Sequence, residues 1–260
     1  MPNIHAEVPN IKLRVNHLSK VFAYPSNKQL VVLDKIDIHL DANEFVCLVG
    51  ASGCGKSTLL KIIAGLEQPS SGEVSIDGET VLGPGADRGM VFQNYTLFPW
   101  RSVADNIGFG LELKGLTKAD RQQQIGYYLD VVGLTKLADA YPKQLSGGMK
   151  QRVAIARALA NEPSVLLMAE HFGALDAQTK EQMQKFMQEL WARTQITILM
   201  VTHDVEEAIF LSQRVYVMGS HPGYIKAEIP INLPAHRDLE LKLEPQFVQI
   251  ERQVIQALGH

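Results

Sequence analysis

The sequence is poor in cysteine, and this shortage excludes a disulfide-stabilised secreted domain. Cys47 and Cys54 are the 2 cysteines among 260 residues. Both fall in a segment that reads as a strand followed by a glycine-rich loop, where a disulfide would distort the loop. We therefore expect two reduced thiols, which favours a cytoplasmic chain.

Long apolar segments and an excess of basic charge are also lacking. No stretch approaches the ~20 apolar residues of a membrane-spanning helix, and residues 1–10 have neither the basic start nor the apolar segment of a signal peptide. Lys and Arg number 25 against 28 Asp and Glu, a net charge of −3. We therefore expect no nucleic-acid partner, and a membrane would be reached only through a partner chain.

A phosphate-binding loop is the strongest feature that the sequence does contain. Residues 45–49 form an apolar run typical of a buried parallel strand, and they lead directly into a glycine-rich loop. The predicted nucleotide-binding residues are Gly50, Ala51, Ser52, Gly53, Cys54, Gly55, Lys56, Ser57 and Thr58. Glycines let successive backbone N–H groups point at one anion, and a helix begins near the lysine. The lysine reaches the β- and γ-phosphates and the following serine binds Mg²⁺, so the pattern predicts ATP and Mg²⁺ binding rather than an ordinary glycine-rich turn.

Two further apolar runs end in polar groups. Residues 165–168 precede Ala169-Glu170-His171, and residues 196–202 precede His203. Ligands lie outside the carboxyl ends of parallel strands, so these groups belong to the same expected site. At 260 residues and 46% hydrophobic content, the chain is long enough for one α/β domain with a subdomain, or for two small domains.

Helical periodicity occupies the middle and the end of the chain. Residues 102–114 and 117–132 have apolar side chains at helical spacing, and we interpret about 95–150 as a helical subdomain inserted in the sheet domain. Residues 244–258 present an apolar face, so we expect the tail, about 219–260, to pack back on the core of a single domain spanning 1–260.

Together these motifs resemble the ATP-binding subunit of an ABC transporter. The resemblance is carried by the phosphate loop, Leu145-Ser146-Gly147-Gly148, Ala174-Leu175-Asp176 and His203, and it covers nearly the whole chain. It implies a P-loop NTPase with a mostly parallel core sheet and an N-terminal antiparallel β portion. It also implies that the helix starting at Ser146, Gly147 and Gly148 grips the γ-phosphate of ATP bound to another copy, so that two cassettes pair and then reopen after hydrolysis.

The resemblance assigns roles to five more residues. Gln93 matches the glutamine that touches Mg²⁺ and senses the transmembrane partner, Glu170 the general base, and His203 the γ-phosphate sensor. Asp176 matches the residue of the dimer-contact loop, and Phe22 the aromatic that stacks on adenine.

Each assignment has a structural alternative. Gln93 could be a solvated loop residue, His203 a histidine at a helix cap beside Asp204, and Phe22 a core residue. Tyr24 competes with Phe22 for the stacking position. The Ser146-Gly147-Gly148 run could be a helix N-cap without a role in binding.

Several segments further resemble importers for nitrate, sulfonate, taurine or bicarbonate. They are residues 84–88, 91–95, 98–100 and the tail around 221–239. None of them touches the transported solute, so they do not distinguish among these anions. The resemblance implies permease subunits, an extracytoplasmic solute-binding protein, a second cassette that is identical or paired, and a location at the cytoplasmic face of the membrane.

One position departs from the family pattern. The family has Asp-Glu-Pro after the strand, where the aspartate holds the water shell of Mg²⁺, whereas this chain has Ala169-Glu170-His171. Phe172-Gly173-Ala174-Leu175-Asp176 follows at the usual spacing, so the register is kept. We expect impaired ATP hydrolysis. The alternatives are a non-hydrolysing scaffold or regulatory partner of an active cassette, and an enzyme in which Glu170 or His171 substitutes for the missing carboxylate.

Overall fold

The computed structural model describes residues 10–23, 29–93, 96–169 and 176–259. Its strands are β1 (Ile11–Ala23), β2 (Gln29–Asp41), β3 (Phe45–Gly50), β4 (Ser71–Ile76), β5 (Glu79–Thr80), β6 (Arg88–Val91), β7 (Val165–Met168), β8 (Thr197–Thr202), β9 (Arg214–Gly219) and β10 (Tyr224–Pro230). Its α-helices are α1 (Lys56–Ile63), α2 (Val103–Leu113), α3 (Lys118–Val131), α4 (Gly147–Leu159), α5 (Ala177–Thr194), α6 (Val205–Leu211) and α7 (Pro245–Leu258). Short 3₁₀ turns lie at η1 (Thr135–Leu137), η2 (Pro142–Gln144) and η3 (Leu239–Leu243).

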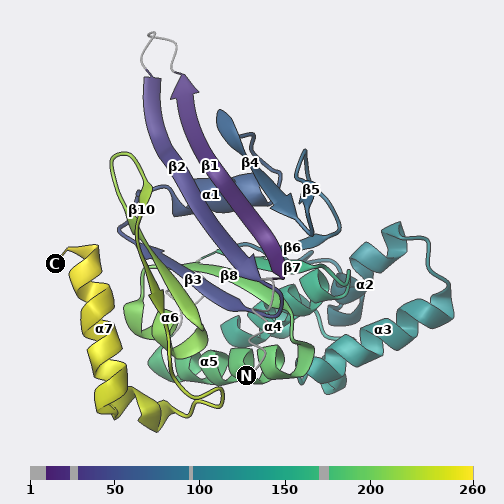
Figure 1. Ribbon diagram of the computed structural model, residues 1–260. Coiled ribbons are helices and arrows are strands. Elements are labelled where there is room, and N and C mark those ends of the chain that lie inside the picture. The colour runs from purple at the N-terminus through teal and green to yellow at the C-terminus, as the bar shows by residue number, and fades with distance from the viewer. Residues whose placement is uncertain (1–9, 24–28, 94–95, 170–175, 260) are drawn as a thin grey trace, which may run out of the picture.

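The strands form two sheets. The core sheet has the order β10-β9-β3-β8-β7-β6, in which β9 to β6 are parallel and β10 pairs antiparallel with β9 at the edge. The second sheet, β2-β1-β4-β5, is antiparallel and lies above the core sheet in Figure 1. The fold is therefore α/β with a mostly parallel core sheet and an N-terminal antiparallel portion, as the sequence predicted.

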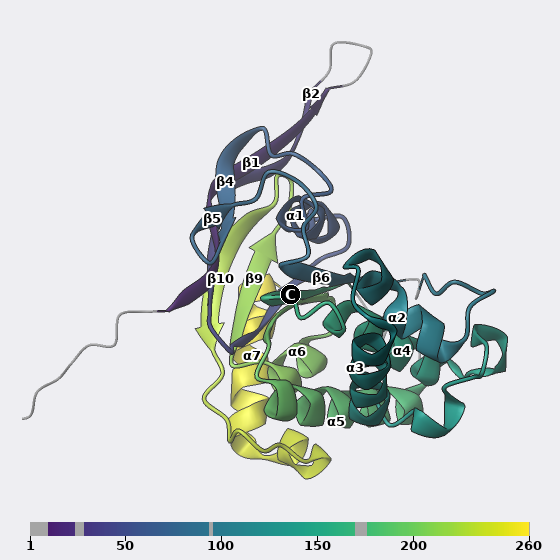
Figure 2. The same cartoon turned by 90° about the vertical axis from the view of Figure 1, so that its right-hand side faces the viewer.

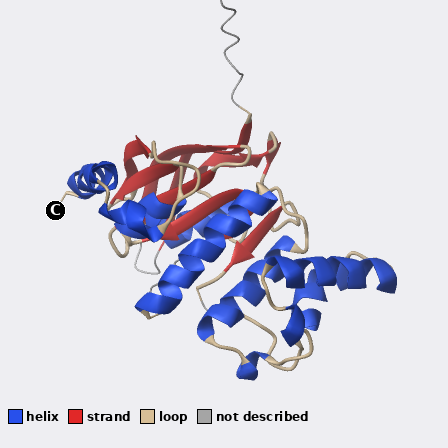
Figure 3. Cartoon of the chain, turned by 90° about the horizontal axis from the view of Figure 1, so that it is seen from below, coloured by secondary structure: helices blue, strands red, loops and turns tan. Residues whose placement is uncertain are grey.

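Alternate residues of β3 serve two hydrophobic cores. Phe45 and Val49 face one cluster, whereas Val46 and Leu48 face the other. The second cluster fills the space between the two sheets, where α1 lies (Figures 1 and 2). The first is covered by helices on the opposite face, seen from below in Figure 3. A strand buried on both faces explains why residues 45–49 are a continuous apolar run.

The helices α2 and α3 project to one side of the core sheet, next to α4 (Figure 2). Ser102 and Thr117 cap them, and each accepts a hydrogen bond from the backbone N–H three residues on. At the other side of the molecule, α7 buries Phe247, Ile250 and Val254 against the core. None of the helices in the described ranges combines the length and the apolar composition that a bilayer crossing requires.

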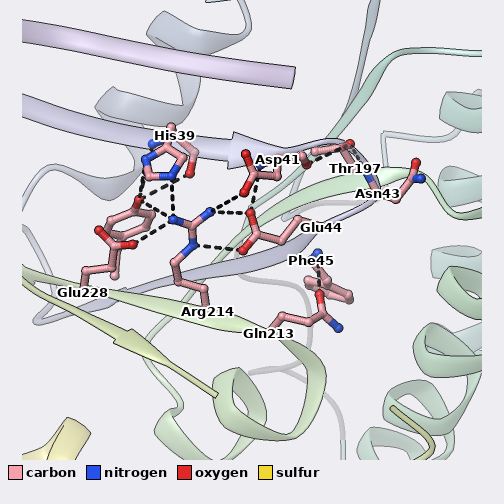
Figure 4. Close-up of polar contacts among 10 residues, drawn as sticks. His39, Asp41, Asn43, Glu44, Phe45, Thr197, Gln213, Arg214 and Glu228 are labelled. Carbon is pink, nitrogen blue, oxygen red and sulfur yellow. Dashed lines mark hydrogen bonds and ion pairs between the residues drawn. The ribbon is translucent and has the colours of Figure 1, made fainter. Parts of the chain in front are cut away.

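An ion-pair network around Arg214 ties the two sheets together (Figure 4). From β9, its guanidinium donates to Glu44 Oε1 at 2.9 Å and to Glu228 Oε1 at 2.7 Å, and its Nη1 lies 2.8 Å from His39 Nε2 in β2. Burial opposes the charge, but the hydrogen bonds to Glu44 and Glu228 and the charge of Glu44 outweigh it and raise the pKa of Arg214. Because His39 and Glu228 come from different sheets, this arginine fixes their relative position.

Candidate functional site

The strand order of the core sheet brings four strand ends to one edge. β3, β8, β7 and β6 are consecutive and parallel, with Val49 opposite Thr202 and Met168 opposite both Met200 and Val91. The glycine-rich loop, His203, Ala169 and the segment containing Gln93 therefore leave the sheet next to one another. This is the edge at which parallel sheets bind ligands.

The loop after β3 has the geometry of an anion cradle. Gly55 has φ 105°, which disfavours any residue with a Cβ, and a Cβ there would lie 2.6 Å from Leu33 Cδ2. The helix α1 begins at the next residue, so the N–H groups of its first turn point toward the loop. The loop thus requires glycine where its backbone packs closely against Leu33, and it ends at the positive end of a helix dipole.

Lys56 lies at the centre of this cradle. Its side chain is 4% exposed, and Nζ donates to the carbonyl oxygens of Gly50 at 2.7 Å and Ala51 at 3.0 Å. Ser57 is exposed and Thr58 is half-buried at the first turn of α1. Ala51, Ser52 and Gly53 are exposed, whereas Cys54 is buried with Sγ 3.9 Å from the Lys56 ammonium. A charged, preoriented ammonium beside exposed N–H and hydroxyl groups fits a polyphosphate.

The turn that carries His203 is braced on both sides. Thr202 Oγ1 accepts a hydrogen bond from Asp204 N at 3.1 Å, and Asp204 caps α6 by accepting from Glu207 N at 2.9 Å. The cap residue is thus Asp204, and His203 itself is exposed at the end of β8. The capping alternative therefore describes the neighbour of His203 rather than the histidine.

Among the described residues, only part of the oxygen ligands expected for the predicted metal site is found. Ala169 follows β7 and donates its N–H to Val91 O at 3.1 Å, which holds it at the edge beside β6. Gln93 is exposed two residues beyond Val91. Mg²⁺ prefers oxygen ligands, and the side chains of Ser57 and Gln93 offer them, whereas the side chain of Ala169 has no oxygen. Glu170 and His171 lie outside the described residues, as do Ala174 and Leu175.

The Leu-Ser-Gly-Gly run and Asp176 stand at the starts of two helices in contact. Ser146 caps α4 and is exposed, and Asp176 caps α5 by accepting from Thr179 N at 2.9 Å and Thr179 Oγ1 at 2.7 Å. These hydrogen bonds lower the pKa of Asp176. A Cβ on Gly148 would lie 3.2 Å from Thr179 Cγ2, so the glycine permits the close approach of the two helix starts. Gly147 beside it is half-buried.

Phe22 is half-buried near the end of β1. The ammonium of Lys20 lies 4.7 Å from the centroid of its ring, and the same ammonium pairs with Glu67 at 2.6 Å. A cation over one side of the ring leaves stacking to the other side. Tyr24, the competing aromatic, lies outside the described residues.

Sequence reasoning missed a buried carboxylate behind His203. Glu207 is 2% exposed, accepts a hydrogen bond from Thr202 Oγ1 at 2.6 Å, and has no partner for Oε1 within the described chain. Burial raises its pKa to about 7, against the opposing hydrogen bond from Thr202. The spacing Asp204 to Glu207 is that of a capping box, a signal that could have identified the pair.

A groove lies between β6 and the helices α2 and α4. Phe98 and Phe109 pack against each other in it with tilted rings whose centroids are 4.7 Å apart, and the Arg157 guanidinium lies 5.4 Å from the centroid of the Phe98 ring. Arg157 Nη1 also donates to Thr96 O at 2.9 Å. Trp100, beside the groove, is 72% exposed. An aromatic and cationic groove of this kind is suited to a docking segment of another protein.

Comparisons with known proteins identify the family and several relatives of the chain. A family model described as ABC transporter matches residues 33–173. The chain is 54% identical to the nitrate import ATP-binding protein NrtD of Synechocystis sp., with 93% of each chain covered. It is 45% identical to the taurine import ATP-binding protein TauB of Roseobacter denitrificans, covering 90% of this chain and 89% of that protein.

A solved structure is similar to the chain as well. The dimeric structure of a post-hydrolysis state of the ATP-binding cassette MJ0796, bound to ADP and Pi, is 30% identical and superposes with a TM-score of 0.73. That comparison covers 85% of this chain and 100% of the other.

Proposed function

Because the chain belongs to the ATP-binding subunits of ABC transporters, we propose that it powers an importer for a small anion such as nitrate, sulfonate, taurine or bicarbonate. The observation that carries the proposal is the Lys56 cradle at a sheet edge shared with Ala169, Gln93 and His203. The names of the relatives that import nitrate and taurine support this class of solute.

We propose that the cradle binds the phosphates of ATP through its backbone N–H groups and through Lys56, while Phe22 stacks on adenine. Ser57 and Gln93 would hold Mg²⁺, which when bound neutralises charge on the phosphates. Glu170 would polarise the attacking water as general base, and His203 would contact the γ-phosphate. The residues of this chain thus orient the nucleotide and the water.

A second cassette would complete the site. The start of α4, where Ser146 is exposed, Gly147 half-buried and Gly148 buried, would offer N–H groups and a helix dipole to the γ-phosphate held by the other copy. Asp176 would contact that copy. The dimeric cassette among the similar structures supports this arrangement, and the partner would be an identical or a paired cassette.

We further propose that the groove lined by Phe98, Phe109 and Arg157 receives a permease subunit, and that Gln93 senses it. The whole of 1–260 would be one cassette, in which about 95–150 is the permease-facing helical subdomain and about 219–260 a tail on the core. It would sit on the cytoplasmic face of the membrane, with an extracytoplasmic solute-binding protein acting through the permease.

Ala169 favours weakened hydrolysis. A carboxylate that orders the Mg²⁺ shell contributes several kcal/mol to the transition state, and ~1.4 kcal/mol is a factor of ten in rate. The same observation favours a second candidate, a non-hydrolysing ATP-binding scaffold that regulates an active cassette. Release of phosphate by the purified chain with ATP and Mg²⁺ distinguishes a slow ATPase from a scaffold.

Three variants test the two-copy site. Lys56→Ala should abolish nucleotide binding, because it removes the cation inside the cradle. Ser146→Arg or Gly147→Asp should leave binding to the monomer near normal and prevent ATP-induced pairing, measured by light scattering after gel filtration. A signature variant that binds ATP as poorly as Lys56→Ala would refute the two-copy site.

A further inference from the structure

We propose that the first turn of α5 mechanically links the start of α4 to the turn that carries His203, and that Lys180 is the positioning residue that makes this link. The inference rests on the proposed function, in which the starts of α4 and α5 face a second cassette. It adds a route by which pairing with that cassette changes the position of His203, the proposed phosphate-contacting residue of the same chain.

The first part of the link joins α4 to α5. The methyl group of Thr179 lies over Gly148, only 3.2 Å from where a Cβ on that glycine would be. The hydroxyl and the backbone N–H of the same threonine are both bonded to Asp176. The side chain of Thr179 therefore packs over the start of α4 and is bonded to the residue that caps α5. We expect a movement of either helix start to displace the other.

The second part joins α5 to the His203 turn. Lys180, the next residue, bonds its backbone N–H to Asp176 O at 2.9 Å and its ammonium to Asp204 Oδ2. Asp204 is the neighbour of His203 and caps α6 through Glu207 N. The residues on both sides of the histidine, Thr202 and Asp204, are thus held, and the ion pair connects them to α5.

The electrostatics keep this ion pair charged. Burial alone would raise the pKa of Asp204, but hydrogen bonds from Lys180 and from the backbone of Glu207 lower it. Burial likewise opposes the charge of Lys180, but the hydrogen bond and charge of Asp204 raise its pKa. The side chains of Lys180 and Asp204 are 25% and 29% exposed, so the pair is partly shielded from water but not buried in the core. Such a pair orients a surface turn more than it stabilises the fold.

The test uses the full chain with Glu170→Gln in every protein, so that hydrolysis does not reopen the pair. The variants are Lys180→Met, His203→Ala, the double variant Lys180→Met with His203→Ala, and the conservative Lys180→Arg. Lys185→Met, an exposed lysine further along α5, is the matched control. Binding of a fluorescent ATP analogue to the monomer and ATP-induced dimerisation over a range of protein concentrations are measured for each.

Lys180→Met should bind the analogue within about twofold of the reference, and its melting temperature should change by no more than about 4 °C. Its dimerisation midpoint should rise by about tenfold or more, because the histidine turn is no longer held in place. The double variant should lose no more than His203→Ala alone, since the two residues act through one turn. Lys180→Arg, which keeps the charge, should dimerise like the reference protein, and so should Lys185→Met. Normal dimerisation of Lys180→Met, or losses that multiply in the double variant, would overturn the inference.

Hydrogen exchange separates this inference from the proposed function. In the monomer, Lys180→Met should speed exchange at the amides of Asp204 and Glu207 by about tenfold, whereas Lys185→Met should not. Unchanged exchange overturns the link by itself. A reference protein that binds ATP and stays monomeric would instead refute the proposed function, and with it the inference that rests on it.

Discussion

The hydroxyl of Thr202 donates a 2.6 Å hydrogen bond to the carboxylate of Glu207, a side chain that is 2% exposed. The charges of Lys180 in α5 and Lys242 in η3 lower the pKa of Glu207, whereas burial and Asp204 raise it, and the result is about 7. A buried acid that titrates near neutrality therefore lies under the turn that carries His203.

This acid predicts a pH-dependent stability. The pKa of Glu207 is raised in the folded state, so its favourable contribution to stability is complete below its ordinary pKa of 4.5 and is lost as pH rises through about 7. Glu207→Gln removes this loss of stability, because the amide does not ionise. Relative to wild type, we expect the variant to gain about 2–3 kcal/mol in free energy of unfolding between about pH 5 and about pH 8, measured by urea denaturation. Glu181→Gln, at an exposed position of α5, is the control. An equal pH dependence in wild type and Glu207→Gln would contradict the raised pKa.

The Arg214 network predicts a large stability loss. Arg214→Met leaves Glu44, whose side chain is 15% exposed, without its bidentate partner. Removing one member of a shielded ion pair costs about 3 kcal/mol, whereas an exposed pair costs under about 1 kcal/mol. Urea denaturation checks the value, with Arg252→Met on the exposed face of α7 as control. A loss as small as that of the control would mean that the sheets are held together elsewhere.

Reversion at the departure from the family pattern predicts a gain of activity. Ala169→Asp with His171→Pro should raise Mg²⁺-dependent phosphate release by roughly a hundredfold or more, because it adds a carboxylate at the end of β7. ATP affinity should change by no more than about tenfold, since the cradle and Lys56 remain. Glu170→Gln in the reverted protein should abolish the gain. Unchanged turnover after reversion would mean that Glu170 or His171 already serves the metal.

Gln93 predicts a defect in coupling rather than in folding. The side chain is exposed, so Gln93→Ala should change the free energy of unfolding by less than about 0.5 kcal/mol. In vesicles that contain the permease, transport per ATP hydrolysed should fall, while Gln122→Ala on the exposed face of α3 should have no effect. A cassette that precipitates on this substitution would point to a structural role for the glutamine.

Local chemistry explains which parts of the fold were predictable. The run 165–168 is β7, and the segment 117–132 became α3 because Thr117 caps it and its apolar residues repeat at helical spacing. The segment 196–202 starts one residue later as β8. The glycine-rich loop was readable because Gly55 needs a positive φ that few other residues adopt. The proposed roles of the site residues and the division at about 95–150 stay predictions.

The polar contacts that join the two sheets and brace the His203 turn were not predictable. Arg214 and Glu44 lie 170 residues apart, and Lys180 and Asp204 lie 24 apart on different elements. Their pairing depends on strand order, which periodicity does not specify. The raised pKa of Glu207 likewise follows from burial by elements distant in sequence, so charge patterning along the chain contains no sign of it.

The position of β3 has a consequence for synthesis of the chain. Its neighbours in the sheet are β8 and β9, which begin at Thr197 and Arg214, so the strand that leads into the nucleotide loop has no partner until most of the chain has left the ribosome. The hairpin of β1 and β2 closes over a short distance and forms first. Until β8 and β9 have been synthesised, the two edges of β3 can pair with other chains. We therefore expect nascent chains truncated before Thr197 to depend on chaperones and to aggregate when these are depleted.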